Sequence, residues 1–359
     1  MKTGVAQHEA AKSKPRKGLL ARLADGPIIC AEGYLFELER RGYVQAGAFV
    51  PEAVLDHPDV VAQVHRDFVH AGSDVVEAFT YYAHREKLRL VGREHQLETM
   101  NREALRIAKE VAAETGALFA GDICNTNVYV PGDAKSIKAC RAMFEEQVAW
   151  AAKADVDYVI AETFSYGAEA KLALETIKSA GLVAAITMTI HREPLTRDGL
   201  TPEACCRMLA DAGADVVGLN CIRGPRTMLP LIARIVRAVD VPVAALPVPY
   251  RTHNRQPTFQ SLRDRHCDCI PGDMPFPVAL DPFTCNRFEI AKFAKDAHAL
   301  GVRYIGLCCG AMPHHIRSIA EALGRHPAAS RYSADMSKHA YFGSDARLKK
   351  SNREFAGKL

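Results

Sequence analysis

Two adjacent cysteines, Cys308 and Cys309, follow a short apolar run at residues 304–307. The run has the composition of a buried strand, and a helical pattern begins shortly afterwards at His315. In α/β proteins, binding and catalytic groups gather where a strand ends and the next helix has not begun. The two thiols are therefore candidates for metal binding or for nucleophilic chemistry.

A third cysteine, Cys221, ends a second apolar run of the same form at residues 215–221, just before a Gly-Pro turn. Structural zinc sites use four protein ligands, whereas catalytic sites use three and keep the fourth position for water or substrate. Three thiolates from two strand ends therefore predict a catalytic zinc site at Cys221, Cys308 and Cys309. The alternative is three separate buried thiols at strand ends.

The other cysteines are weaker metal candidates. Cys205 and Cys206 fall within a helical pattern, where adjacent side chains point in different directions. Cys267 and Cys269 form a Cys-x-Cys pair in a long loop, which can bind a metal, but no second pair is near them in sequence. The remaining four are interpreted as small buried apolar groups, namely Cys30, Cys124, Cys140 and Cys285.

Eight apolar runs alternate with helical patterns along the chain. Their near-continuous apolar composition is typical of parallel strands buried on both faces. Eight strand–helix units in 359 residues predict a (β/α)8 TIM barrel, and the alternative of an open doubly wound sheet lacks a Gly-x-Gly-x-x-Gly loop after the first strand. The expected strands are 28–33, 74–80, 118–124, 157–163, 183–189, 215–221, 242–248 and 304–307.

In such a barrel all eight strand ends open on one face. The ends of strands six and eight, with one strand between them, should lie about 10 Å apart, so thiolates from both can reach one ion. Glu162 at the end of strand four is a candidate for holding an amino group, or else part of an internal ion pair. Tyr81, Tyr82 and Phe49 offer aromatic faces, which attract onium cations, although a single ring is more often part of a core.

The composition is globular, with 48% hydrophobic and 25% charged residues and a net charge of +4. The sequence contains no basic block interleaved with aromatics, which would have predicted nucleic-acid binding. It also contains no apolar run of about 18 residues, which would have predicted a membrane helix. The 11 cysteines and the lack of a signal peptide indicate a reduced, cytoplasmic protein. The expected parts are a disordered basic leader at 1–17, the barrel at 18–326, and at 327–359 an arm that packs on a neighbouring subunit, or else a disordered tail.

The stretches Gly218-Leu-Asn-Cys221 and Gly306-Leu-Cys-Cys-Gly310, followed by Pro313-His-His-Ile-Arg317, resemble the homocysteine S-methyltransferases, which are zinc-dependent barrels with three cysteine ligands. Residues 39–44, 51–53, 79–83 and 160–162 are similar to the betaine–homocysteine S-methyltransferase branch of that family. The resemblance implies methyl transfer from an onium donor, betaine or a similar quaternary ammonium or sulfonium, to homocysteine, giving methionine without S-adenosylmethionine. It also implies a homodimer or homotetramer built with the C-terminal arm.

The resemblance further implies roles for individual positions, with three departures from the family pattern. The family's aspartate after strand one is Ala31 here, so Glu32 is expected to substitute from one position along. A donor-cage tryptophan aligns with Phe49 and a tyrosine with Thr163, which leaves the identity of the donor open. The expected residues are Cys221, Cys308 and Cys309 for zinc; Glu162, Ile222, Glu32 and Gly33 for homocysteine; and Tyr82, Phe49, Tyr81 and Thr163 for the donor.

Two other functions fit the same residues. The altered loop after strand one is compatible with a methyltransferase that acts on a different thiol. A non-catalytic barrel that binds onium solutes, with a purely structural zinc, is the second alternative. A fourth protein ligand at the metal, such as a histidine, would favour the non-catalytic barrel.

Overall fold

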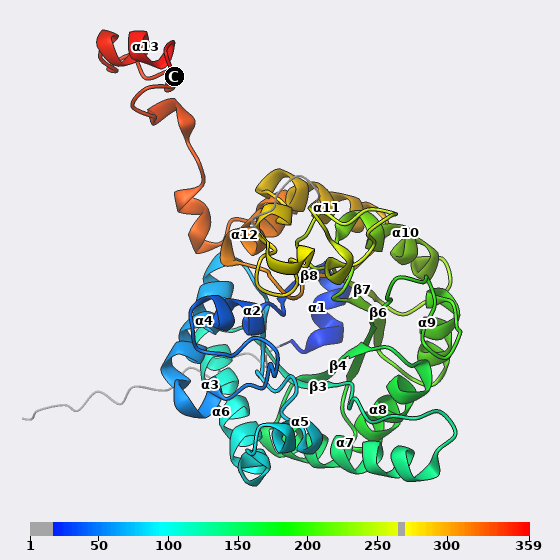
Figure 1. Ribbon diagram of the computed structural model, residues 1–359. Coiled ribbons are helices and arrows are strands. Elements are labelled where there is room, and N and C mark those ends of the chain that lie inside the picture. The colour runs from blue at the N-terminus through cyan, green and yellow to red at the C-terminus, as the bar shows by residue number, and fades with distance from the viewer. Residues whose placement is uncertain (1–16, 265–269) are drawn as a thin grey trace, which may run out of the picture.

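The computed structural model describes residues 17–264 and 270–359. Eight parallel strands form one nearly closed barrel surrounded by helices (Figure 1), which confirms the predicted (β/α)8 fold. Every strand is buried along its whole length, as its apolar composition requires. The strands are β1 Ile28–Ala31, β2 Val75–Glu77, β3 Leu118–Cys124, β4 Tyr158–Phe164, β5 Ala184–Met188, β6 Val216–Asn220, β7 Val243–Leu246 and β8 Tyr304–Leu307.

The helices of the outer layer begin and end where local sequence signals place them. Asp133 accepts hydrogen bonds from two backbone amides at the start of α7, and Asn286 forms a capping box at the start of α11. Gly72 and Gly116 adopt left-handed conformations that end α4 and α6. The layer consists of α4 Pro58–Ala71, α6 Leu97–Thr115, α7 Ala134–Ala154, α8 Gly167–Ser179, α9 Pro202–Asp211, α10 Pro225–Val236, α11 Arg287–Ala299 and α12 Pro313–Ala322.

The barrel closes between β1 and β2 without a regular ladder. The sheet order runs from β1 through β8 round to β2, and each neighbouring pair in that order is parallel. Asp74, just before β2, bridges the remaining gap: its amide donates to the Ile29 carbonyl and its carboxylate accepts from the Ile29 amide, both at 2.7 Å. Arg325 also binds the Asp74 carboxylate at 2.5 Å, so a basic side chain from beyond α12 supports the closure.

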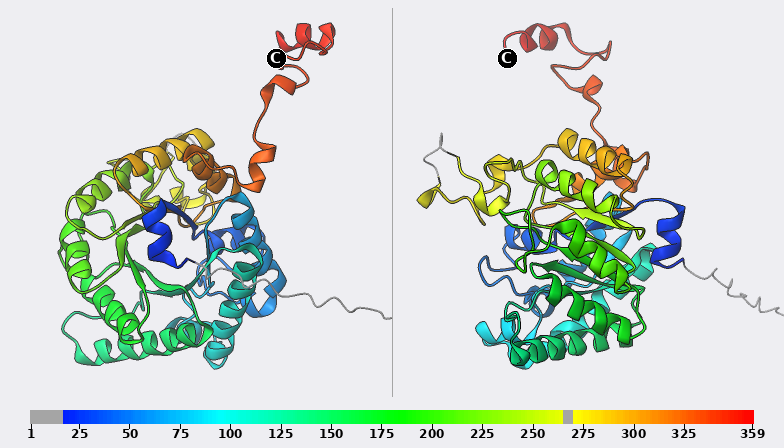
Figure 2. Two further views of the ribbon diagram at one scale, coloured as in Figure 1. Left: turned by 180° about the vertical axis from the view of Figure 1, so that it is seen from behind. Right: turned by 90° about the vertical axis from the view of Figure 1, so that its right-hand side faces the viewer.

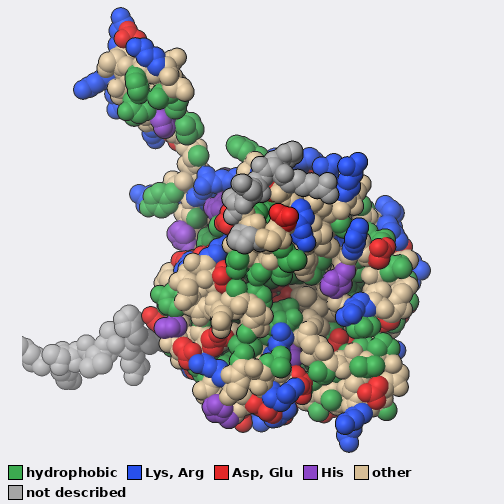
Figure 3. Space-filling view, in the orientation of Figure 1, with side chains coloured by type: hydrophobic (Ala, Val, Ile, Leu, Met, Phe, Trp, Pro, Cys, Tyr) green, Lys and Arg blue, Asp and Glu red, His purple; other side chains and the backbone are tan. Residues whose placement is uncertain are grey.

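Helix α1, Leu19–Asp25, covers the amino-terminal end of the barrel (Figure 2). Leu19 and Leu23 are buried in one cluster with residues of the barrel interior. Deeper inside, the hydroxyls of Tyr158 and Tyr304 lie 2.8 Å apart. Because this end is filled, the space for a ligand lies at the opposite end, where the strands' carboxyl ends open and the surface is hollowed (Figure 3).

Several segments differ from the expectations. Three short helices, α2 Tyr34–Arg40, α3 Ala53–Asp56 and α5 Arg85–Leu90, occupy regions where only loops were expected. Strand β2 is shorter than predicted because the Thr80 amide donates to the Ala78 carbonyl at 2.7 Å and turns the chain. The long segment after β7 is largely irregular and contains only the 3-10 turns η2 Phe259–Ser261, η3 Pro271–Asp273 and η4 Asp281–Phe283 among its described residues. The Cys267–Cys269 pair and residues 1–16 of the expected leader lie outside the described residues.

After α12 the chain runs away from the barrel (Figures 1 and 2). This segment contains the turns η5 Ala328–Tyr332 and η6 Met336–Lys338 and the helix α13 Lys350–Ala356. Its aromatic side chains are exposed, at 69% for Tyr332 and 60% for Phe342. None of the helices in the described part of the chain has both the length and the apolar composition that a membrane crossing needs.

Candidate metal centre and substrate pocket

The sulfur atoms of Cys221, Cys308 and Cys309 all lie within 4.8 Å of one another. The Cys308 and Cys309 sulfurs are 4.0 Å apart. Sulfur ligands of a tetrahedral metal, with bonds of about 2.3 Å, lie about 3.8 Å apart, so a small adjustment allows the three thiols to share one ion. Among the described residues, no fourth histidine, cysteine, aspartate or glutamate joins this group.

Both cysteine-bearing loops are attached to the end of β7, the strand between them. The Cys221 amide donates to the Leu246 carbonyl at 2.9 Å, and the Cys308 amide donates to the Pro247 carbonyl at 3.0 Å. Two loops that are far apart in sequence are thereby held by the adjacent carbonyl groups of Leu246 and Pro247. This shared attachment is what brings the thiols of β6 and β8 together.

The three thiols are electrostatically coupled. Hydrogen bonds from the other two thiols lower the pKa of Cys221 well below its usual value. Burial, together with the charge of Cys221, raises the pKa of Cys308, and the bond that Cys309 makes with Cys221 raises the pKa of Cys309. Hydrogen bonds within the cluster therefore favour the thiolate form of Cys221. A divalent ion that binds the three sulfurs would displace thiol protons.

A small recess lined by four carboxylates adjoins the thiols. Glu32 and Glu162 lie within 4.8 Å of each other and of Cys308, and Glu162 also groups with Glu77 and Asp122 at the same limit. All four acidic side chains are buried. The recess has a volume of about 20 Å³, which is room for about one water molecule or one ammonium group.

Burial raises the pKa of every carboxyl group in this recess. It raises the pKa of Glu162 to about 8, even though the Thr163 hydroxyl and the Asn220 amide donate to its carboxylate. For Asp122 and Glu32, burial is again the main cause, and the nearby charge of Glu162 adds to it. Because these groups repel one another when ionised, the recess favours a bound cation.

Asn220, the last residue of β6, connects the recess to the thiols. Its side-chain nitrogen donates to Glu162 at 2.5 Å and lies 3.8 Å from the Cys308 sulfur. Its side-chain oxygen accepts the Thr163 amide at 2.9 Å. No role was predicted for Asn220, and in the structure this side chain fixes Glu162 relative to the cysteines.

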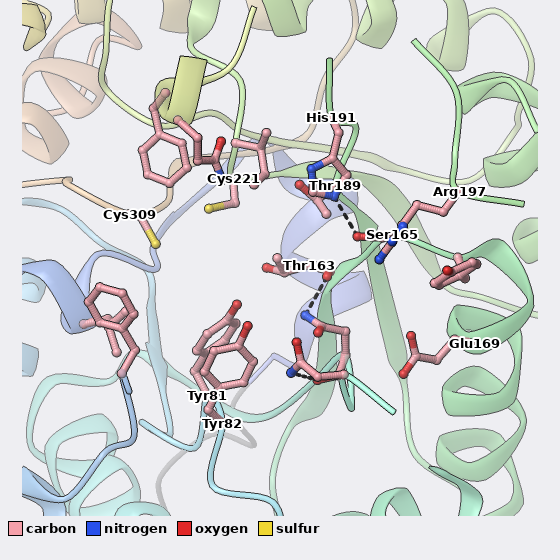
Figure 4. Close-up of a pocket in the computed structure, with 18 of the residues that line it drawn as sticks. Tyr81, Tyr82, Thr163, Ser165, Glu169, Thr189, His191, Arg197, Cys221 and Cys309 are labelled. Carbon is pink, nitrogen blue, oxygen red and sulfur yellow. Dashed lines mark hydrogen bonds between the residues drawn. The ribbon is translucent and has the colours of Figure 1, made fainter. Parts of the chain in front are cut away.

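A larger pocket of about 490 Å³ lies next to the thiols (Figure 4). Cys221 and Cys309 form part of its wall, together with the expected donor residues Phe49, Tyr81, Tyr82 and Thr163 and with Ile222. The Tyr81 and Tyr82 rings are 4.2 Å apart between centroids, and Phe49 stacks on Phe36 at 5.7 Å. The Lys87 ammonium lies 4.0 Å from the centre of the Tyr82 ring, so this ring already attracts one cation.

Many of the expected site residues have strained backbones. Phe49, Tyr82, Thr163, Cys221 and Ile222 all have φ between 53° and 61°. Such left-handed conformations cost about 1–3 kcal/mol each for residues other than glycine, and they gather at functional sites. All five residues line the pocket, so the backbone conformations indicate a functional site here without reference to the side-chain chemistry.

Three expected residues contribute differently from the rest. Gly33 lines neither the recess nor the pocket; it lies against Ala311, two residues after Cys309, where a Cβ atom on Gly33 would approach the Ala311 carbonyl to 2.8 Å. The Ile222 carbonyl accepts the Phe259 amide at 2.8 Å, so its peptide also anchors the segment after β7. The Thr163 hydroxyl is already bonded to Glu162, although its side chain borders both the recess and the pocket.

Sequence reasoning missed several polar residues of the site. Glu77 and Asp122 lie inside predicted strands, where a charged residue in an apolar run was the available signal. His191, Ser165 and Arg197 line the far end of the pocket (Figure 4). They come from loops after β4 and β5 whose sequences carry no recognisable pattern.

Comparison with known proteins gives consistent matches. Residues 29–323 match the family model described as homocysteine S-methyltransferase. S-methylmethionine--homocysteine S-methyltransferase BHMT2 of Mus musculus is 38% identical over 88% of this chain and 83% of that protein. Betaine--homocysteine S-methyltransferase 1 of Danio rerio is 37% identical over 92% of this chain and 80% of that protein. The metallated homocysteine methyltransferase MmuM from Escherichia coli shares the fold, with a TM-score of 0.65 at 19% identity over 84% of this chain and 98% of that chain.

Proposed function

Because the chain belongs to the homocysteine S-methyltransferase family, we propose that it transfers a methyl group from an onium donor to homocysteine, giving methionine. The observation that carries this proposal is the convergence of Cys221, Cys308 and Cys309 between an acidic recess and an aromatic pocket. The donor class is betaine or a similar quaternary ammonium or sulfonium compound.

Cys221, Cys308 and Cys309 would hold a zinc ion. Their chemistry fits this ion, since three soft thiolates and a free fourth position are typical of zinc sites that bind a substrate. When bound, zinc lowers the pKa of a coordinated thiol and so supplies a sulfur nucleophile at neutral pH. The chain's own residues then have to position both substrates around that sulfur.

Glu162 and Glu32 would hold the ammonium group of homocysteine. The recess beside Cys308 has the size of one ammonium group and is surrounded by carboxylates, so a bound cation would relieve their mutual repulsion. Glu32 thus takes the part that an aspartate at position 31 would have played. Gly33 and the Ile222 peptide shape the loops around the bound amino acid.

Tyr82, Tyr81, Phe49 and Thr163 would surround the onium group of the donor. Aromatic ring faces stabilise a cation without forming a bond that the methyl transfer must break. The homocysteine sulfur attacks the methyl carbon, the bond from carbon to the donor nitrogen or sulfur breaks, and its electron pair remains on the donor as a neutral amine or sulfide. The walls of the pocket keep the methyl carbon aligned between the two heteroatoms.

The segment 327–359 would act as an arm that packs on a second copy of the chain. Its exposed aromatic side chains and its course away from the barrel support a homodimer or homotetramer. All described cysteines are free thiols, in keeping with a reducing compartment such as the cytoplasm.

Neither alternative function is favoured. Glu32 reaches the recess despite the altered loop after β1, which removes the reason for a different thiol acceptor. The described residues supply no fourth side-chain ligand to the three thiols, unlike a purely structural metal site.

The direct test measures methionine formed from homocysteine by zinc-loaded protein. Betaine, dimethylsulfoniopropionate and S-methylmethionine are offered separately. The proposal expects methyl transfer from at least one of these donors and its loss in Cys309→Ala. Absence of transfer from all three, with zinc bound, would refute it.

A further inference from the structure

The far end of the large pocket contains a cation without an acidic partner. Arg197 lines the pocket, and its guanidinium group forms no ion pair with any described residue. It lies instead over the ring of Tyr166, 5.1 Å from the ring centre. A guanidinium group that contacts an aromatic ring through its carbon still has N–H donors available for a ligand.

The loop that carries Arg197 is fixed to the end of β4. The Arg197 amide donates to the Ser165 carbonyl at 2.8 Å. The neighbouring Asp198 carboxylate accepts the amides of Gly167 at 3.0 Å and Ala168 at 2.9 Å, at the start of α8. Asp198 is therefore bound to the helix and does not neutralise Arg197.

Two further hydrogen-bonding side chains lie at the same end. The Ser165 hydroxyl and the His191 ring nitrogen Nε2 are 2.9 Å apart. Arg223 holds the His191 loop in place, since its guanidinium donates to the carbonyls of Ile190 at 2.9 Å and Arg192 at 3.0 Å. The charge and the hydrogen-bonding groups are thus both preorganised.

One carboxylate also reaches this end of the pocket. Glu169 binds the Thr126 amide and hydroxyl through a single oxygen, at 2.8 Å and 2.7 Å. It makes no ion pair with Arg197, so the arginine keeps its charge available to a ligand.

We propose that Arg197, supported by Ser165 and His191, binds the carboxylate of the methyl donor. Cys221 and Cys309 lie at one end of the pocket, Arg197 lies at the other, and Tyr81 and Tyr82 lie beside the space between them (Figure 4). A zwitterion whose onium methyl points to the thiols would place its anionic tail near the guanidinium. The inference rests on the proposed function and narrows the donor to onium carboxylates.

During methyl transfer the carboxylate remains unchanged. The donor loses its cationic charge when the carbon–heteroatom bond breaks, and the electron pair stays on nitrogen or sulfur. Arg197 therefore binds donor and demethylated product through the same group and acts on donor affinity rather than on the chemical step. It is a specificity residue, and its removal should raise KM for the donor with little effect on kcat.

The test compares Arg197→Gln with Arg192→Gln, a control in the same loop whose side chain does not line the pocket. Steady-state kinetics are measured with each carboxylate donor that the unaltered protein accepts among betaine, dimethylsulfoniopropionate and S-methylmethionine. Trimethylsulfonium, which lacks a carboxylate, serves as a competitive ligand. Arg197→Gln should raise donor KM about 10- to 100-fold, leave the trimethylsulfonium inhibition constant unchanged, and be partly rescued by Arg197→Lys.

An equal effect of Arg197→Gln on trimethylsulfonium and on the carboxylate donors would overturn the inference. So would a donor KM no higher than that of Arg192→Gln. Neither result touches the proposed function, which fails only if the unaltered, zinc-loaded protein transfers no methyl group from any donor.

Discussion

Asn220 donates a 2.5 Å hydrogen bond to Glu162, and its nitrogen lies 3.8 Å from the sulfur of Cys308. One amide at the end of β6 thus positions the group that would hold the substrate amine relative to a group that would hold the metal. Because Asn220 and Glu162 are both buried, no water molecule would replace this hydrogen bond if the Asn220 amide were removed. The position of the amine-binding carboxylate of Glu162 relative to the metal-binding sulfur of Cys308 therefore depends on one side chain from β6.

Asn220→Asp should weaken homocysteine binding. The new carboxylate would face Glu162 without a donor hydrogen, so one of the two would take up a proton and the amine would lose an ionic partner. We expect the KM for homocysteine to rise about tenfold or more, measured by initial rates with zinc-loaded protein. Asn125→Asp is the control, because Asn125 donates to the Thr163 carbonyl at 2.9 Å and does not contact Glu162. Equal KM values for both variants would argue against this role.

Asp122 should make stability depend on pH. Burial and the charge of Glu162 raise the pKa of Asp122 well above its usual value, and the nearby Thr80 hydroxyl offsets only part of this rise. Above an unfolded-state pKa of about 4, the folded protein retains a proton that the unfolded chain releases. Its contribution is thus fully present below pH 4 and is lost as pH rises toward the raised folded-state pKa.

Asp122→Asn should remove this contribution. We expect urea unfolding of the metal-free protein to show a shallower decline in unfolding free energy between pH 5 and 8, with the variant more stable than the unaltered protein by about 1–3 kcal/mol at pH 8. Asp240→Asn, at an exposed position, should leave the pH profile as it is. A profile for Asp122→Asn identical to that of the unaltered chain would contradict the assignment.

Gly310→Ala should destabilise the loop that carries the paired cysteines. Gly310 has φ of +90°, and an added Cβ would collide with the Tyr250 hydroxyl, which is held by Arg40 at 2.9 Å. We expect a loss of about 3 kcal/mol or more in unfolding free energy and weaker zinc binding in competition with a chelator. Gly324→Ala separates the two causes, because Gly324 has φ of +77° with open space around it and should cost only about 1 kcal/mol. Similar losses for the two variants would mean that the Tyr250 contact is unimportant.

Deleting residues 330–359 should reduce the number of chains in the assembly. The segment contributes exposed Tyr332, Phe342 and Phe355, which a lone barrel leaves uncovered. Light scattering coupled to size exclusion gives the mass of the full chain and of the truncated chain. In the full chain, Phe342→Asp should weaken association in the same direction. An unchanged oligomer after truncation would eliminate the arm as an interface.

The barrel and the cysteines could be predicted because each rests on a local pattern. Buried parallel strands require apolar runs, and Cys221, Cys308 and Cys309 directly follow two of them. Parallel strands also share one carboxyl end, so a common location for the thiols followed from topology alone.

The rest of the site depends on contacts between distant loops. Nothing in the sequence around Arg197 indicates that the Tyr166 ring lies beneath its guanidinium group. Nor does it indicate that the Asp198 carboxylate accepts a hydrogen bond from a backbone amide at the start of α8. Likewise, Glu77 and Asp122 become a cluster with Glu162 only when β2, β3 and β4 are placed side by side. The short helices α2, α3 and α5 were not predicted, because helices of one or two turns are stabilised by packing and are too short to show a clear periodicity.

The central claim is that three cysteines hold one zinc ion and leave a position for the substrate sulfur. X-ray absorption at the zinc edge, measured with and without homocysteine, tests it most directly. We predict one zinc per chain with three sulfur neighbours at about 2.3 Å and one lighter atom, changing to four sulfur neighbours when homocysteine is added. The account would be contradicted if homocysteine left the ligands of the zinc ion unchanged. It would also be contradicted if the protein bound no zinc after incubation with an excess of the ion.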